Sequence, residues 1–178
     1  MILDFTFEQV MRLSNLKRWG IVEMSRSQSV AEHSYDVAMI SAFIVDSLPN
    51  KIKTAHLREI VINWSLVHDL PELVTGDIPT PIKGLIKHSL DGAEEDLFPK
   101  LTNFKKGHSK LAMAICKAAD LMDAIQFARK FCVDSRKVEI ISEMHFFLDE
   151  LADDMLEGDE AIELGKVIRQ ICKEEKTL

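Results

Sequence analysis

The segment WSLVHDLPELVTGD, which runs from Trp64 to Asp77, places one histidine and three carboxylates where an apolar helical pattern ends. His68 and Asp69 are adjacent, and Glu72 and Asp77 follow within eight residues of Asp69. Borderline divalent metals favour such a mixture of imidazole and carboxylate ligands. The segment therefore has two interpretations: a helix end followed by a solvated loop, or half of a metal site.

The backbone around this histidine–aspartate pair decides whether both side chains can reach one ion. Adjacent residues in a straight helix point about 100° apart, so His68 and Asp69 would not converge in the middle of a helix. Pro71 disfavours helical geometry at Leu70, and the helix is therefore expected to end there. That break would free the two side chains to face a common point.

Two polar residues in other helices complete the candidate constellation. His33 lies in the first turn of a helix that begins near Ser29, and Asp120 lies inside KAADLMDAI, the most apolar part of a later helix. Each has a simpler explanation, because an isolated histidine is more often a core or surface residue and Asp120 could pair with Lys117. The combination H … HD … D on helices nevertheless favours a metal site with these ligands: His33, His68, Asp69 and Asp120.

The elements that must position these residues are helical, because apolar residues recur with helical spacing nearly throughout the chain. TGDIPTPIKG, residues 75–84, is expected to be a loop because glycine and proline interrupt it. No strand-like alternation or repeat is apparent, so the sequence predicts an all-α protein with one domain over residues 1–178. The expected helices are a short one that starts at Phe7 and ends before Lys17, one with a Ser29–Glu32 capping box that ends before Pro49, one capped by Thr54, one or two short ones within 87–106, one from Ser109, one capped by Asp134 that ends at Gly158, and one from about Asp159 to Glu174.

Composition and charge narrow the classes of protein. The formal charge of -7 argues against a partner that is a nucleic-acid polymer, because such a binder needs a basic face. The longest apolar run, residues 37–45, is too short to span a membrane, and the N-terminal residues do not form a signal peptide. Cys116, Cys132 and Cys172 are odd in number and form no C-x-x-C motif, which predicts a reducing, cytoplasmic location.

Four segments resemble the HD-domain phosphohydrolases, and most closely the bacterial 5′-deoxynucleotidases and the phage dATP triphosphohydrolases. They are RW at residues 18–19, SVAEHS around His33, HDLPELVTGDIPTPIK from His68 to Lys83, and KAAD ending at Asp120. The resemblance implies a single HD-domain helical bundle and a divalent metal, Co²⁺, Mn²⁺ or Zn²⁺, held by H … HD … D. It further implies cleavage of the 5′ phosphoester of 2′-deoxynucleotides, with release of phosphate from a dNMP or triphosphate from a dNTP such as dATP.

The resemblance also assigns roles near the ion. Glu72 matches the residue that handles the proton of the attacking water or leaving group, and its crowding by Asp69 predicts a raised pKa. A solvent-exposed glutamate in a first turn is the simpler alternative. The spacing from the HD pair to Asp120 is shorter than in the bacterial monophosphatases, and the compact chain resembles the phage enzymes more.

Further residues are candidates for binding the nucleotide. By the resemblance, Arg18 binds phosphate, Trp19 lies near the sugar and base, and Asp77 contacts the sugar. From its position beside Trp19, Ile21 is a candidate for lining the base pocket. Lys83 and Lys117 could offset phosphate charge, which favours tolerance of longer phosphate tails, although Lys117 could instead pair with an aspartate of its own helix.

Two rival functions remain open at this stage. One is a phosphodiesterase acting on cyclic or oligonucleotides, and the other is a non-catalytic sensor that binds nucleotide. The RW and TGDIPTP segments favour the nucleotidase over the phosphodiesterase, and the presence of Glu72 favours catalysis over sensing. The resemblance implies a homo-oligomer, either a dimer or an assembly of dimers, for which the adjacent Phe146 and Phe147 could supply an interface.

Overall fold

The computed structural model describes residues 4–54 and 56–174 of the 178-residue chain. These ranges contain no strand, only isolated bridges between Lys17 and Ser29 and between Met24 and Cys132. The helices are α1 (Phe7–Met11), the 3-10 helix η1 (Arg12–Ser14), α2 (Val30–Ser47), α3 (Leu57–Val67), α4 (Glu72–Thr75), α5 (Thr80–Leu97), α6 (Pro99–Lys106), α7 (Lys110–Phe131), α8 (Lys137–Met155) and α9 (Gly158–Glu174). The predicted all-α class is confirmed.

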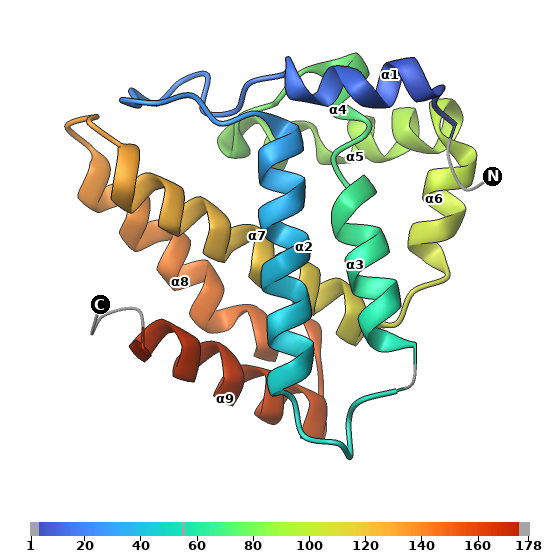
Figure 1. Cartoon of the computed structure of the whole chain (residues 1–178), viewed down its shortest axis with the longest axis vertical. Helices are drawn as coiled ribbons and strands as arrows, with labels where there is room; N and C mark the ends of the chain where they lie inside the picture. Colours follow the sequence, from blue (N-terminus) through green and yellow to red (C-terminus); the bar gives the residue numbers. More distant parts are fainter. Residues whose placement is uncertain (1–3, 55, 175–178) are drawn as a thin grey trace.

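The core lies where α2, α3 and α7 pack together. Val37 and Ile44 on α2, Val61 on α3 and Ile115 on α7 are completely buried. A run of buried alanines on α7, which includes Ala118, presents small side chains that let the other helices approach closely. α8 packs on α7, and α9 packs on α8 (Figure 1). None of the helices in the described ranges is long and apolar enough to cross a membrane.

The course of these helices brings distant residues to one end of the bundle. α2 runs away from that end, and α3 returns beside it, so the start of α2 lies near the end of α3 (Figure 1). α7 crosses both helices and packs against them. The first turns of α2, the C-terminus of α3 and the middle of α7 are therefore positioned to share a site.

Several predicted helix starts are confirmed by side-chain caps. The hydroxyl of Ser109 accepts a hydrogen bond from the backbone N–H of Ala112 at the start of α7. The hydroxyl of Ser29 accepts one from the N–H of Glu32 at the start of α2. The predicted capping box is only half formed, because the carboxylate of Glu32 instead accepts from Arg26, at 2.8 Å.

Three predicted boundaries are wrong. α3 begins after His56 rather than at a Thr54 cap, and His56 makes no side-chain capping bond. α8 begins after Arg136, because the carboxylate of Asp134 accepts the N–H of Arg136 in the turn before the helix instead of capping it. Gly158 does not end α8, which stops at Met155; with a φ of 62° it begins α9.

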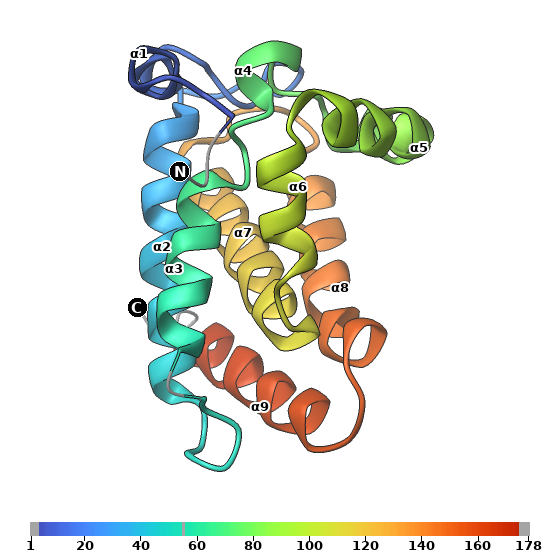
Figure 2. The same cartoon turned by 90° about the vertical axis from the view of Figure 1, so that its right-hand side faces the viewer.

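The predicted loop at residues 75–84 is also wrong from Thr80 onward, where α5 begins. Pro81 stands at the start of this helix, where its missing N–H has no helical partner to lose and its fixed φ suits the helix. α5 and α6 together occupy the expected polar segment. Figure 2 shows α5 projecting away from the bundle, and none of its described side chains is buried.

Candidate metal centre and nucleotide site

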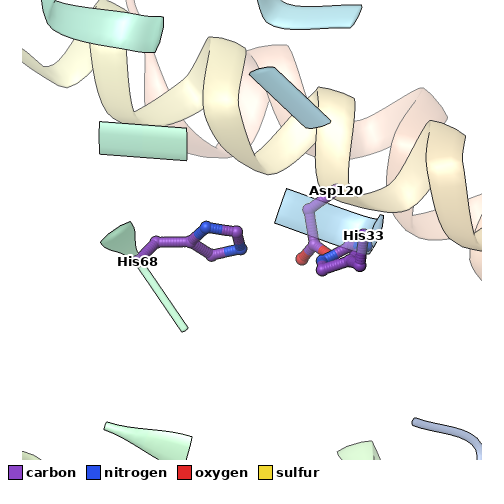
Figure 3. A group of neighbouring side chains, drawn as sticks. All are labelled: His33, His68 and Asp120. Atoms are coloured by element: carbon purple, nitrogen blue, oxygen red, sulfur yellow. The ribbon is translucent and has the colours of Figure 1, made fainter. Parts of the chain in front are cut away.

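The four predicted ligands meet at one end of the bundle. The Nε2 atom of His33 lies 3.3 Å from the Oδ1 atom of Asp120 and 3.4 Å from the Oδ2 atom of Asp69. The Nε2 atom of His68 lies 3.4 Å from the other oxygen of Asp69. Ligand atoms of His33, His68 and Asp120 all lie within 4.8 Å of one another, and Figure 3 shows these side chains converging.

The backbone break expected at Pro71 is what allows this convergence. α3 ends at Val67, His68 is its C-cap residue, and a turn leads through Pro71 into α4. His68 and Asp69 therefore lie past the last helical turn, and the two side chains reach the same point although they are adjacent in sequence.

The hydrogen bonds of the two histidines test whether the site fits a metal ion. Nδ1 of His33 donates to the Oδ2 atom of Asp123 at 2.6 Å, and Nδ1 of His68 donates to the carbonyl oxygen of Ser65 at 2.8 Å. Each bond places a proton on Nδ1, so that Nε2 is the nitrogen that faces the candidate site. Both Nε2 atoms are buried and have no hydrogen-bond partner. Imidazoles oriented in this way, beside two carboxylates, form a donor set that fits a divalent cation.

The charges of the site agree with this interpretation. Burial would raise the pKa of Asp120, but the cations Lys117, His33 and Arg18 hold it well below its usual range. Burial lowers the pKa of His68. Burial also acts to lower the pKa of His33, but the neighbouring carboxylates outweigh it and raise that pKa to about 9. In the metal-free protein the His33 ring therefore carries a second proton, on Nε2, which a bound cation would displace.

Glu72 is buried beside the ligands rather than exposed to solvent, so the simpler alternative for this residue is wrong. Its Oε1 atom accepts a hydrogen bond from Lys83 at 2.7 Å, whereas its Oε2 atom is buried without a hydrogen-bond partner. Burial and the charge of Asp69 raise the pKa of Glu72 to about 7, against the opposing effect of Lys83. A carboxyl group with such a pKa can both accept and return a proton near neutral pH.

Trp19 is held in an unusual backbone conformation next to the site. Its φ is 69°, the one positive φ of a residue other than glycine in the described ranges. The Trp19 N–H donates to the Oδ2 atom of Asp77 at 3.2 Å, and the indole stacks on Phe127 with ring centroids 6.1 Å apart. Backbone strain of this kind costs about 1–3 kcal/mol and is maintained mainly at functional sites.

Arg18 lies between this tryptophan and the ligands. Its guanidinium nitrogens are 3.7 Å from Asp120 and 3.5 Å from Asp123. The contact of Nη1 with Asp123 is an ion pair and not a hydrogen bond, so the hydrogen-bonding capacity of this buried atom is not used within the protein.

Two residues of the site were not among the predicted ones. Gln28 is completely buried; its amide nitrogen donates to Asp123 at 2.9 Å, and its oxygen accepts from the indole N–H of Trp19 at 3.0 Å. A continuous set of hydrogen bonds thus joins Trp19, Gln28, Asp123 and His33. Asp123 could have been predicted as a site residue, because it lies three residues after Asp120 in an apolar stretch. No feature of the sequence around Gln28 predicts its role.

The other predicted binding residues are placed unevenly. Lys83 pairs with Glu72, and Lys117 pairs with Asp120, so each stands beside the site in an ion pair. Ile21 is 59% exposed on the segment after Trp19, and it does not line the cavity beside the ligands. In the described ranges, every predicted site residue except Ile21 therefore lies in or beside this site.

Comparison with known proteins identifies the family. Residues 5–96 match the model of the family described as 5′-deoxynucleotidase YfbR-like. This chain belongs to the YfbR-like 5′-deoxynucleotidase family. It is thus an enzyme of the HD-domain phosphohydrolase class, as the resemblance implied.

The relatives of this YfbR-like protein include named enzymes. It is 31% identical to a dATP triphosphohydrolase of Acinetobacter phage SH-Ab 15497, over 68% of this chain and 66% of the phage protein. It is 30% identical to a 5′-deoxynucleotidase of Erwinia tasmaniensis, over 70% of this chain and 71% of the relative. The alignments thus span roughly two thirds of each relative's length.

A solved structure confirms the HD-domain fold. The HD phosphohydrolase of cyanophage S-2L, solved with dA and one catalytic Zn²⁺ ion, aligns with a TM-score of 0.84 over 96% of this chain and 98% of the phage chain. The sequence identity in that alignment is 24%.

Proposed function

We propose that this YfbR-like protein cleaves the 5′ phosphoester of 2′-deoxynucleotides with one divalent ion held by His33, His68, Asp69 and Asp120. The observation that supports this most is the pair of buried, unpartnered Nε2 atoms facing ionised carboxylates. Glu72 and Arg18, which carry a proton-accepting oxygen and an unpartnered donor, stand beside them. The named relatives act on deoxynucleotides, which agrees with this substrate class.

The reaction adds water across the bond between phosphorus and O5′. Arg18 binds the phosphoryl oxygens, and the Oε2 atom of Glu72 takes a proton from the water as its oxygen bonds to phosphorus. The bond from phosphorus to O5′ breaks, and Glu72 returns the proton to O5′. Lys83 holds the other oxygen of Glu72 in place. A divalent ion in the site would polarise the phosphoryl oxygens and make a nearby water more acidic.

The identity of the ion is part of the proposal. Two imidazoles and two carboxylates suit Zn²⁺, Co²⁺ and Mn²⁺. The structural relative from cyanophage S-2L contains Zn²⁺, which favours zinc among them. Thermal unfolding of the chelator-treated protein, followed with each metal in turn, measures the preference independently of catalysis.

The nucleoside is proposed to lie on the side of Trp19. The indole offers a flat surface for the sugar or base, and the carboxylate of Asp77 can accept a hydrogen bond from the 3′-OH while it also accepts the Trp19 N–H. Ile21 remains a candidate for the wall of a base pocket. A variant Ile21→Ala with an unchanged base preference would remove Ile21 from this role.

Product analysis tests the proposed reaction. Purified, metal-loaded protein is incubated with dNMPs, dNTPs and NTPs, and the products are separated by chromatography. We expect deoxynucleoside together with phosphate or triphosphate, and a loss of about 10²–10⁴-fold in kcat for Glu72→Gln. Turnover of cyclic or oligonucleotides alone would favour the phosphodiesterase, and binding without turnover would favour the sensor. Activity of Glu72→Gln equal to wild type would overturn the assigned role of Glu72.

The assembly and the location of the protein stay predictions. Phe146 and Phe147 on α8 are exposed, at 63% and 55%, as a homo-oligomer interface would require of the isolated chain. The cytoplasmic location rests on the cysteine pattern, an odd number of cysteines without a C-x-x-C motif. Light scattering on the purified protein measures the oligomer, and Phe146→Ser tests whether α8 forms its interface.

A further inference from the structure

A cavity of about 230 Å³ opens beside the metal ligands, between α3, α5, α6 and α7. His68, Asp69 and Asp120 form part of its wall, whereas Arg18, Trp19 and Asp77 do not line it. The cavity therefore extends from the ligands in a direction other than the proposed nucleoside side. Pockets that enclose a whole drug-sized ligand measure about 300–1,000 Å³, so this one suits a part of the substrate.

Besides the carboxylates of the proposed ligands Asp69 and Asp120, the wall of this cavity carries three lysines. Lys83 from α5, Lys105 from α6 and Lys117 from α7 line it, together with one carboxylate remote from the ligands, Glu94 of α5. Such a set of ammonium groups binds phosphate oxygens by charge-assisted hydrogen bonds. A metal ion and one arginine suffice for a monophosphate, so three additional lysines indicate a longer anionic group.

Lys105 differs from the other two lysines. The ammonium groups of Lys83 and Lys117 are paired with carboxylates of the reaction site, Glu72 and Asp120. Lys105 is half-buried and forms no ion pair with any residue in the described ranges. Glu94 is its acidic neighbour: burial raises the pKa of that carboxyl group, and the charge of Lys105 acts against this increase. The positive charge of Lys105 is thus available in the part of the cavity formed by α6.

We propose that Lys105 binds the terminal phosphates of a 5′-triphosphate in this cavity and so makes dNTPs the preferred substrates. This inference rests on the proposed function. With the α-phosphate at the metal ligands and the nucleoside on the Trp19 side, the β- and γ-phosphates enter the cavity. One water is consumed, the bond between the α-phosphorus and O5′ breaks, and deoxynucleoside and inorganic triphosphate leave. Glu94 opposes the tail, because it brings negative charge to the same wall.

The main test compares two adjacent lysines of α6. Lys106 is exposed and paired with Glu95, and it does not line the cavity, so Lys106→Gln is a matched control for Lys105→Gln. The value of kcat/KM is measured for the best dNTP of the four and for the corresponding dNMP. For Lys105→Gln we expect kcat/KM to fall about 10-fold with the dNTP and to change less than about 2-fold with the dNMP. Lys106→Gln should leave both values unchanged.

A binding measurement separates recognition of the tail from catalysis. Calorimetric titration of the metal-loaded protein with inorganic tripolyphosphate should give a Kd about 10-fold weaker for Lys105→Gln than for wild type. Glu94→Gln should tighten the same Kd, because it removes the opposing charge. Circular dichroism and thermal unfolding verify that each variant is folded.

The outcomes distinguish this inference from the function on which it rests. If wild type turns over no deoxynucleotide, the proposed function fails and the inference fails with it. If wild type turns over deoxynucleotides but Lys105→Gln loses dNMP and dNTP activity equally, or loses neither, Lys105 does not select the tail while the proposed function stands. A wild type that cleaves dNMPs and leaves dNTPs intact overturns the inference in the same way.

Discussion

The two walls of the site are built differently. The ligand wall, which carries the proposed metal ligands, is formed by α2, α3 and α7, where His33 is completely buried among core side chains such as Val30 and Val37. The cation wall comprises the lysines of the cavity: Lys83 and Lys105 lie on α5 and α6, whereas Lys117 lies on α7. α5 contributes no buried side chain among those described. Elements with few buried contacts open at a lower free energy than the core. The proposed ligands are therefore fixed before substrate arrives, whereas Lys83 and Lys105 lie on elements that can adjust to it.

α6 is the better anchored part of the cation wall. The carboxylate of Asp4 accepts the backbone N–H groups of Lys100 and Leu101 at its start, at 2.9 and 3.0 Å. Near its end, the ring of Phe104 contacts that of Trp64 on α3, with centroids 6.2 Å apart. The helix that carries Lys105 is thus held against the core, whereas the position of Lys83, near the start of α5, depends on its hydrogen bond to Glu72.

The largest effect is expected from breaking the ligand wall. His68→Ala removes one of the unpartnered Nε2 atoms and should lower kcat/KM by about 10³-fold or more, because metal polarisation supplies several kcal/mol of the barrier reduction. Metal content by mass spectrometry should fall with it. His88→Ala, on the exposed face of α5, is the matched control and should leave kcat/KM and the metal content unchanged. Full metal occupancy in His68→Ala would show that the ligand wall has been misassigned.

A smaller effect is expected from the residue that orients a ligand. Asp123→Asn weakens the bond that fixes the Nδ1 proton of His33 and should lower zinc affinity about 10–100-fold, measured by competition with a chelator. Asp91→Asn on α5 provides an exposed control on the other wall. Unchanged zinc affinity in Asp123→Asn would mean that burial alone orients the His33 ring.

The two walls also differ in how far the sequence predicts them. The meeting of the proposed ligands could be predicted because polar residues such as His33 and Asp120 interrupt apolar helical faces and because Pro71 follows the end of α3. The hydrogen bond between Gln28 and Asp123 could not be predicted, since it joins residues 95 positions apart and depends on how helices pack. Lys105 was missed for a similar reason: a half-buried lysine on a polar helix has no sequence pattern until α6 folds against α3.

The link between the walls, the bond from Lys83 to Glu72, can be tested by pH. With a pKa of about 7, Glu72 loses its proton-accepting form as the pH falls below 7, so kcat/KM should fall about tenfold per pH unit there. Lys83 lowers that pKa, so Lys83→Met should move the midpoint to higher pH. Lys87→Met, an exposed lysine of the same helix, should leave the midpoint in place. If Lys83→Met leaves the midpoint unchanged, the fall of kcat/KM at low pH is caused by the titration of a group other than Glu72.

The smallest expected effect concerns folding stability and tests the difference in packing directly. Ile115→Val removes one buried methylene from α7 and should lower the free energy of unfolding by about 0.5–1.5 kcal/mol. Leu85→Ala removes more atoms, but Leu85 is 82% exposed on α5, so its effect should stay within about 0.5 kcal/mol. Urea unfolding of both metal-free variants measures the contrast. If Leu85→Ala proves the more destabilising, α5 is covered by another surface in solution, and the cation wall is as fixed as the ligand wall.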